Sequence, residues 1–239
     1  MFLSTYKVIG ILGGMGPEAT IDLYNHIISL TPALKDQDHI PTLIFSNPKI
    51  PDRTASINSE LAKVVIDYLC EGAVILERGG SDCIIIPCNT AHIYYDEIQN
   101  AVKVPVLNMI YETAQYITEH YPDIKKAGLL ATSGTVKMQL YQRFLENNSI
   151  QTYVPSETVQ KDYVTKAIYD IKAGKSLDDA EILLKKAIAS LDSPPPQLII
   201  MGCTEIPLAL RTPIEDCVFI NPTRILADCA VKLCIDRKY

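Results

Sequence analysis

Two apolar runs, each ending in a cysteine and small polar residues, restrict the possible folds of this chain more than any other feature. Residues 84–90 read IIIPCNT and residues 198–205 read LIIMGCTE. An unbroken apolar run of this length is typical of a strand buried on both faces, as in a parallel sheet covered by helices. Ligands bind beyond the carboxyl ends of the strands in such sheets. Cys88 and Cys203 are therefore candidate functional residues.

The matching runs belong to a longer internal repeat. Three pairs of landmarks recur at nearly constant spacing: Gly10 and Gly128 (118 residues apart), Cys88 and Cys203 (115), and the stretches 104–108 and 217–221 (113). Such spacing indicates a duplication, and we predict an α/β fold of two lobes, each a small parallel sheet flanked by helices. Because the last helical segment can pack back on the first lobe, we predict a discontinuous first lobe of residues 1–110 and 216–239. The second lobe then comprises residues 111–215.

Composition and charge exclude several classes of function. The chain has 239 residues and a net charge of −6, which argues against a nucleic-acid partner because phosphate binding needs a basic surface. No apolar run approaches the ~20 residues that cross a bilayer, so no membrane partner is expected. The seven cysteines are accompanied by neither a signal peptide nor zinc-ligand spacing. We therefore expect reduced thiols in the cytoplasm and no metal site.

A glycine-rich turn near the start allows two interpretations. Gly14, Gly16 and Ala19 follow an apolar strand and fit the pattern G-x-G-x-x-A of dinucleotide-binding turns. The next strand, however, ends in Ser46 and Asn47, where an acidic residue that binds ribose would be expected. The same turn can present backbone amides to a ligand carboxylate, since it opens a helix. A nucleotide-binding oxidoreductase is therefore an alternative function.

Two thiols in matching loops suit the inversion of a carbon stereocentre. One base removes the proton from one face of the carbon while an acid delivers a proton to the opposite face. An unperturbed thiol pKa of ~8.5 permits both protonation states near neutral pH, so neither a metal nor an organic cofactor is required. His92 could orient a thiolate, although a lone histidine is more often a packing or helix-surface residue.

Six stretches carry a family likeness: 11–17 (ILGGMGP), 50–54 (IPDRT), 87–92 (PCNTAH), 132–135 (TSGT), 172–174 (KAG) and 202–205 (GCTE). In these stretches the chain resembles the aspartate/glutamate racemase superfamily, specifically its aspartate racemase branch of cofactor-independent amino-acid racemases. The resemblance covers nearly the whole chain. It implies two pseudo-symmetric α/β lobes, an active site in the cleft between them, and a homodimer.

The resemblance also implies roles for individual residues. Cys88 and Cys203 match the two acid/base thiols, and Arg53 and Lys172 match basic positions that bind the substrate carboxylates. Glu205 is expected to hydrogen-bond beside Cys203 or to cap the following helix. Further substrate contacts are expected in the matching loops, at Met15, Asn47, Asn89, Thr90, Thr132, Thr135, Thr204 and Glu205.

These features predict a racemase independent of pyridoxal phosphate that inverts the α-carbon of an acidic amino acid, with aspartate favoured over glutamate. Related isomerases of the same superfamily, a maleate isomerase or a hydantoin racemase, are alternatives, as is a non-catalytic amino-acid-binding protein. One methylene separates aspartate from glutamate and discriminates by only ~1–3 kcal/mol, so the choice depends on the shape of the pocket. The sequence does not assign which cysteine begins as the thiolate.

Overall fold

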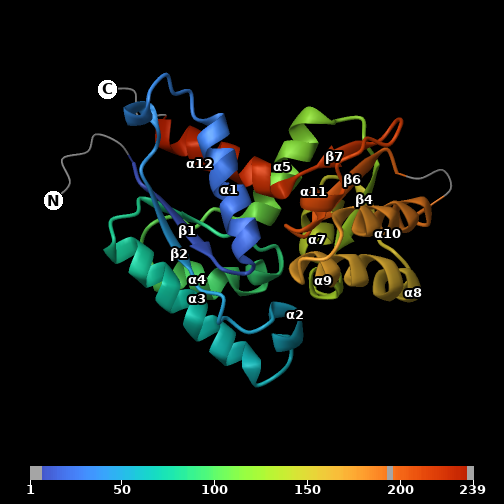
Figure 1. The fold of residues 1–239 in the computed structure, drawn as a ribbon, viewed down its shortest axis with the longest axis horizontal. Coiled ribbons are helices and arrows are strands. Elements are labelled where there is room, and N and C mark those ends of the chain that lie inside the picture. The colour runs from blue at the N-terminus through green and yellow to red at the C-terminus, as the bar shows by residue number, and fades with distance from the viewer. Residues whose placement is uncertain (1–6, 193–195, 236–239) are drawn as a thin grey trace. The chain divides into compact units, whose positions relative to one another are not determined.

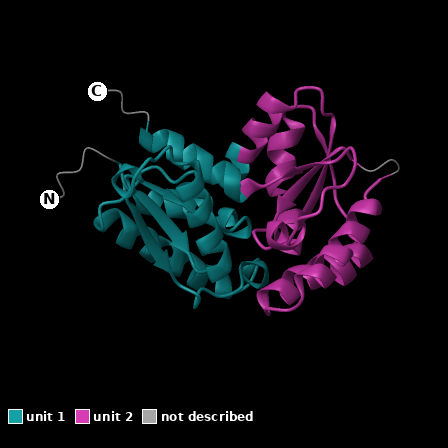
Figure 2. Cartoon of the chain, turned by 45° about the horizontal axis from the view of Figure 1, so that its top comes forward, with its two compact units in different colours: residues 1–112, 223–239 teal, residues 113–222 magenta. Residues whose placement is uncertain are grey.

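The chain divides into two compact units in a computed structural model that describes residues 7–192 and 196–235. Unit 1 comprises Met1–Glu112 and Thr223–Tyr239, and unit 2 comprises Thr113–Pro222 (Figure 2). Each unit contains a parallel sheet flanked by helices (Figure 1), which confirms the predicted α/β fold. None of the helices in the described residues is long and apolar enough to span a membrane.

The sheet of unit 1 has three parallel strands in the order β2–β1–β3. They are β1 (Ile9–Gly13), β2 (Thr42–Ser46) and β3 (Cys83–Ile85). Val106 extends the sheet beyond β3 through an isolated parallel bridge to Ile84. Every residue of β1 and β3 is buried, so these strands are covered on both faces, as is usual in parallel sheets.

Helices supply this cover. They are α1 (Pro17–Leu30), the 3-10 turn η1 (Asp36–Asp38), α2 (Arg53–Ser56), α3 (Leu61–Arg78), the 3-10 helix η2 (Thr90–Tyr94), α4 (Tyr95–Ala101), α5 (Met109–His120), which continues into unit 2, and α12 (Pro222–Ile235). On one face of the sheet, Ile9 and Ile11 pack with α1 and α12. On the other face, Leu12 and Ile84 pack with α3 and α4. Alternate residues of a strand therefore belong to two separate cores.

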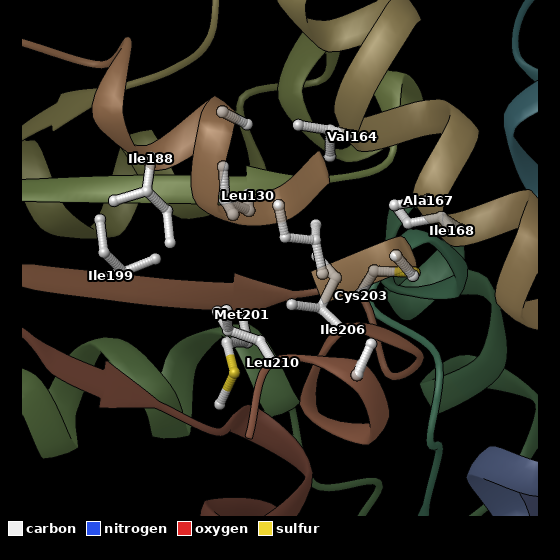
Figure 3. Close-up of a cluster of buried hydrophobic side chains, with 14 of the residues drawn as sticks. Leu130, Val164, Ala167, Ile168, Ile188, Ile199, Met201, Cys203, Ile206 and Leu210 are labelled. Carbon is white, nitrogen blue, oxygen red and sulfur yellow. The ribbon is translucent and has the colours of Figure 1, made fainter. Parts of the chain in front are cut away.

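Unit 2 contains a four-stranded parallel sheet in the order β5–β4–β6–β7. Its strands and helices are β4 (Lys126–Ala131), α6 (Ser133–Lys137), α7 (Leu140–Glu146), β5 (Gln151–Tyr153), α8 (Glu157–Val159), the π-helical turn η3 (Gln160–Thr165), α9 (Lys166–Lys172), α10 (Leu177–Ala189), β6 (Leu198–Gly202), α11 (Ile206–Ala209) and β7 (Val218–Ile220). Leu130, Ile199 and Met201 of the sheet pack with η3, α9, α10 and α11 in one core (Figure 3).

The two sheets share one strand order and one register. In unit 1, a glycine of β1 pairs with one residue of β2 and one of β3, and that β3 residue pairs in turn with Val106. In unit 2, a glycine of β4 pairs in the same way with β5 and β6, and the β6 residue pairs with one residue of β7. The counterparts are Gly10 with Gly128, Leu43 with Tyr153, Ile84 with Ile199, and Val106 with Phe219. Cys88 and Cys203 each follow the matched isoleucine by four residues. The registers thus agree with the predicted duplication.

The boundaries of the units differ from those of the predicted lobes. The prediction assigned residues 216–239 to the first lobe, but β7 pairs in parallel with β6, so residues 216–222 belong to unit 2. The other division lies after Glu112 rather than after residue 110. Residues 1–6, 193–195 and 236–239 of the predicted lobes lie outside the described residues.

The turn after β1 provides a test of how closely two loops of unit 1 approach each other. Gly14 has a φ of +91°, and a Cβ atom there would lie 2.4 Å from the backbone N and C of Asn47. Gly80 has a φ of +97° but faces open space. We expect Gly80→Ala to lower the free energy of unfolding by about 1–2 kcal/mol and Gly14→Ala by about 3 kcal/mol or more, because only Gly14→Ala adds a backbone clash. Urea unfolding followed by circular dichroism measures both, and equal losses would contradict the clash.

Candidate active site

The Cys88 loop leaves β3 at the carboxyl edge of the unit 1 sheet. Cys88 is 6% exposed, and its backbone N–H donates to the Ile86 carbonyl at 2.8 Å. Asn89 and Thr90, also buried, begin the 3-10 helix η2, and the His92 N–H donates to the Asn89 carbonyl at 3.1 Å. Three predicted site residues therefore lie in one tight turn.

His92 holds this turn through its ring nitrogens. Its Nδ1 lies 2.9 Å from the Cys88 carbonyl oxygen, and its Nε2 accepts the Met109 N–H at 3.1 Å. Because Nε2 is an acceptor, the ring proton lies on Nδ1 and is donated to the carbonyl. Burial lowers the pKa of His92 to about 4, so the ring is neutral near pH 7. His92 thus bonds to backbone groups around Cys88, and we interpret it as a support of the loop rather than as a partner of the thiolate.

A buried arginine joins the loops that follow β1 and β2. Arg53 Nη1 donates to the carbonyl oxygens of Pro51 at 3.0 Å and Ile50 at 3.3 Å, and its Nη2 donates to that of Met15 at 3.0 Å. The residue is 8% exposed. Three of the five N–H groups of the side chain therefore bind backbone carbonyls of two loops. A contact between Arg53 and a substrate carboxylate stays a prediction.

The hydrogen bonds of the glycine-rich turn bear on the dinucleotide alternative. The Gly14 N–H donates to the Thr20 hydroxyl oxygen at 2.9 Å, so this amide is already bonded in the turn that the dinucleotide alternative would use. Asn47, at the end of β2, donates its N–H to the Gly13 carbonyl at 3.2 Å and so lies beside the same turn.

Within the part of the chain that the structure describes, no three His, Cys, Asp or Glu side chains are grouped so that they could hold a metal ion.

The Cys203 loop leaves β6 in unit 2 and surrounds a buried carboxylate. Cys203 Sγ donates to Glu205 Oε2 at 2.9 Å, and Thr204 Oγ1 donates to the same oxygen at 3.2 Å. Glu205 Oε1 lies 3.9 Å from Nζ of Lys172, the last residue of α9. Cys203 also borders the apolar core of unit 2 (Figure 3). The structure therefore brings Cys203, Thr204 and Lys172 together around the carboxylate of Glu205.

The surroundings of Cys203 favour its thiol form. Burial raises the pKa of Cys203 well above that of an ordinary thiol, and the negative charge of Glu205 raises it further. The positive charge of Lys172 acts in the opposite direction. The hydrogen bond to the carboxylate also needs the proton on sulfur. Cys203 is therefore protonated near neutral pH.

The loop after β4 holds the remaining predicted residues. Thr132 caps α6, since its Oγ1 accepts the Thr135 N–H at 3.2 Å and donates to Thr135 Oγ1 at 3.1 Å. Thr135 is fully buried. Gln160 of η3 donates from Nε2 at 3.0 Å to the carbonyl of Ala131, the last residue of β4 before this loop. The sequence did not indicate Gln160, because its position depends on a π-helical turn, a feature often found near functional sites.

Comparisons with known proteins agree on one family. Residues 12–230 match the family described as Asp/Glu/Hydantoin racemase. The chain is 33% identical to the broad specificity amino-acid racemase RacX of Bacillus subtilis (strain 168) over 234 residues, 94% of this chain and 96% of that protein. It resembles the structure of Picrophilus torridus aspartate racemase with a TM-score of 0.79 and 30% identity, covering 95% of this chain and 93% of that one. The glutamate racemase of Aquifex pyrophilus is 27% identical over 145 residues, 60% of this chain and 54% of that protein.

Neutral, buried His92 makes a pH-dependent contribution to stability. Folding lowers its pKa from 6.5 to about 4, so the unfolded chain binds more protons between these values. The contribution is complete above about pH 6.5 and is lost as the pH falls towards 4, and about 2 kcal/mol of it is lost by pH 5. Urea unfolding of the wild type and His92→Gln at pH 7 and pH 5 isolates this contribution. The variant should be less stable at pH 7 and lose less on acidification, and an equally steep loss would contradict the assignment.

Proposed function

Since the chain belongs to the Asp/Glu/hydantoin racemase family, we propose that it is a cofactor-independent racemase of acidic amino acids, with aspartate as the favoured substrate and glutamate as the second candidate. The observation that carries the proposal is the repeated position of the two cysteines. Each lies four residues after a matched register position, Ile84 of β3 or Ile199 of β6, on the buried strand that pairs with the glycine of β1 or β4. Family membership points away from the nucleotide-binding oxidoreductase.

Racemisation in this proposal uses one thiolate and one thiol on opposite faces of the α-carbon. The thiolate removes the α-proton, forming an S–H bond while the Cα–H bond breaks. The thiol on the opposite face then gives its proton to the carbon, and its sulfur becomes the thiolate. Atoms and charge balance within the two cysteines and the substrate. Buried polar groups around the substrate must stabilise the negative charge that develops on its carboxylate in the transition state.

Two cationic side chains support an acidic substrate. Arg53 begins α2 after the loop that carries Asn47, and Lys172 ends α9 with its Nζ 3.9 Å from Glu205 Oε1. Both are expected to bind carboxylates. Amides and hydroxyls of the loops are proposed as the other contacts to the amino and carboxylate groups: Met15, Asn47, Asn89, Thr90, Thr132, Thr135 and Thr204. The similarity to an aspartate racemase supports aspartate, and the similarity to RacX supports a wider range of substrates.

The setting of the enzyme is also part of the proposal. All seven cysteines are free thiols, which suits a reducing compartment such as the cytoplasm.

We propose a homodimer, as the family resemblance implies. Sedimentation equilibrium at micromolar concentration distinguishes the dimer from the monomer.

The first test is racemisation itself. Purified protein incubated with L-aspartate or L-glutamate, without pyridoxal phosphate, should yield the D-enantiomer, with faster turnover of aspartate. Chiral chromatography measures the enantiomers, and incubation in deuterium oxide should place deuterium on the α-carbon because the thiol that protonates the carbon exchanges its proton with the solvent. A 5-substituted hydantoin tests the hydantoin racemase activity that the family description also names. If both amino acids remained optically pure, the proposed substrate class would be wrong.

The second test removes each thiol. Cys88→Ala and Cys203→Ala should each reduce kcat/KM by about 10²–10⁴-fold or more, because a two-base inversion needs both groups. Matched controls are Cys70→Ala in unit 1 and Cys217→Ala in unit 2, since both thiols are free and partly exposed. The controls should keep near wild-type rates. Unimpaired racemisation by either Cys88→Ala or Cys203→Ala would rule out the two-base mechanism.

A further inference from the structure

Two cysteines of unit 1 that lie outside the candidate active site meet where the sheet packs against the last helix. Cys83 is the first residue of β3, and Cys234 lies in the last turn of α12. The thiol of Cys83 hydrogen-bonds to the sulfur of Cys234, and both side chains belong to the apolar core that β1 forms with α1 and α12. This contact joins two thiols that are far apart in the sequence and that the proposed racemisation does not use.

We propose that Cys83 and Cys234 form a site of reversible oxidation, at which a hydroperoxide converts the two thiols to a disulfide that links β3 to α12. Cys83 begins β3, whereas Cys88 follows the carboxyl end of the same strand. The oxidation site and the candidate active site therefore lie at opposite ends of one strand. The inference does not depend on the proposed racemase function.

The groups beside this pair favour ionisation at Cys234. Lys7 Nζ donates to the carbonyl of Leu233, the residue before Cys234, at 2.8 Å. The hydrogen bond from Cys83 and the positive charge of Lys7 lower the pKa of Cys234, although burial and the negative charge of Asp82 oppose them. The hydrogen bond and burial raise the pKa of Cys83. Cys234 is therefore the first of the two to ionise, and Cys83 keeps its proton.

Exposure indicates the same order of reaction. Cys83 is 0% exposed and Cys234 is 6% exposed. Cys234 also lies in the terminal turn of a helix, and such ends open more readily than strands within a sheet. Movement of this turn admits the oxidant and lets the two sulfur atoms approach from hydrogen-bonding to bonding distance. The hydroperoxide therefore meets Cys234 first.

The oxidation consists of two balanced steps. In the first, the Cys234 thiolate attacks one oxygen of the hydroperoxide, an S–O bond forms and the O–O bond breaks, and the departing oxygen takes up the proton that Cys234 released. In the second, the sulfur of Cys83 attacks the sulfenic acid at Cys234, an S–S bond forms and the S–O bond breaks, and the departing hydroxide takes the Cys83 proton to become water. The two thiols lose two electrons, and the hydroperoxide gains them.

The test oxidises the whole protein with hydrogen peroxide, blocks the remaining thiols with N-ethylmaleimide and maps the disulfides by mass spectrometry. Trypsin leaves Cys83 and Cys88 together in the peptide 79–103 and Cys234 in the peptide 233–237, so fragmentation of the linked peptides identifies the bonded sulfur. Peroxide is increased until Cys70, a partly exposed thiol, begins to react. By then Cys83 and Cys234 should be joined in most molecules, and dithiothreitol should restore both thiols. Absence of this linkage at that point would overturn the proposal.

Matched variants of α12 test the order of the two steps. Cys234→Ala removes the sulfur that reacts first, so Cys83 should stay reduced under the same treatment, which labelling of sulfenic acids with dimedone measures. Cys229→Ala changes another cysteine of the same helix and should form the Cys83–Cys234 linkage as the wild type does. Sulfenic acid at Cys83 in Cys234→Ala would contradict the order.

The linkage should also raise thermal stability. The oxidised wild type should unfold about 5 °C or more above the form reduced with dithiothreitol, because a disulfide restricts the unfolded chain. Cys234→Ala should show no such difference. If that variant fails to fold, the wild-type comparison still decides, since equal unfolding temperatures of its two forms would contradict a bond between β3 and α12. Neither measurement uses racemisation, so their outcomes are separate from those that test the proposed function.

Discussion

The parallel pairing of a buried central strand with its neighbours is the constraint on which the rest of each unit depends. All residues of β1, and those of β4 after Lys126, are buried, so their backbone N–H and C=O groups must find partners in the sheet. A slip of one residue would also turn the apolar side chains from one core to the other. The register therefore fixes where β3 and β6 end. The positions of Cys88 and Cys203 follow from this hydrogen bonding before any chemistry of the thiols is considered.

Much of the fold was predictable because its signals are local. The apolar runs before Cys88 and Cys203 indicate buried strands by themselves, and three pairs of landmarks at nearly constant spacing indicate the duplication. The boundary of unit 2 near residues 217–221 was harder to predict from the sequence. Residues 217–221 look like a strand, but only their pairing with β6 shows that they belong to unit 2 rather than to the segment that follows. The corresponding stretch of unit 1, residues 104–108, pairs with β3 through an isolated bridge between Val106 and Ile84.

The candidate site was predictable as a set of loops but not as a set of contacts. Arg53 bonds to Met15, which lies 38 residues earlier in the chain, and His92 bonds to Met109, 17 residues later. No local pattern encodes these pairs, because they depend on which loops the sheet brings to one edge. The contact of Glu205 with Cys203 is different, since the two are separated by only two residues. The sequence allowed that contact, but burial, which gives it energetic weight, is a property of the folded unit.

Arg53 and Gly14 together have a mechanical consequence for unit 1. The guanidinium bonds to carbonyls of the loops after β1 and β2, and the glycine leaves no space between its turn and Asn47. Neither loop can be displaced alone without breaking hydrogen bonds of a buried cation or moving its neighbour. We therefore expect this edge of the sheet to resist bending. If the two loops bind the substrate as proposed, related proteins would accept substrates of other sizes through exchange of individual side chains, and not through bending of these loops.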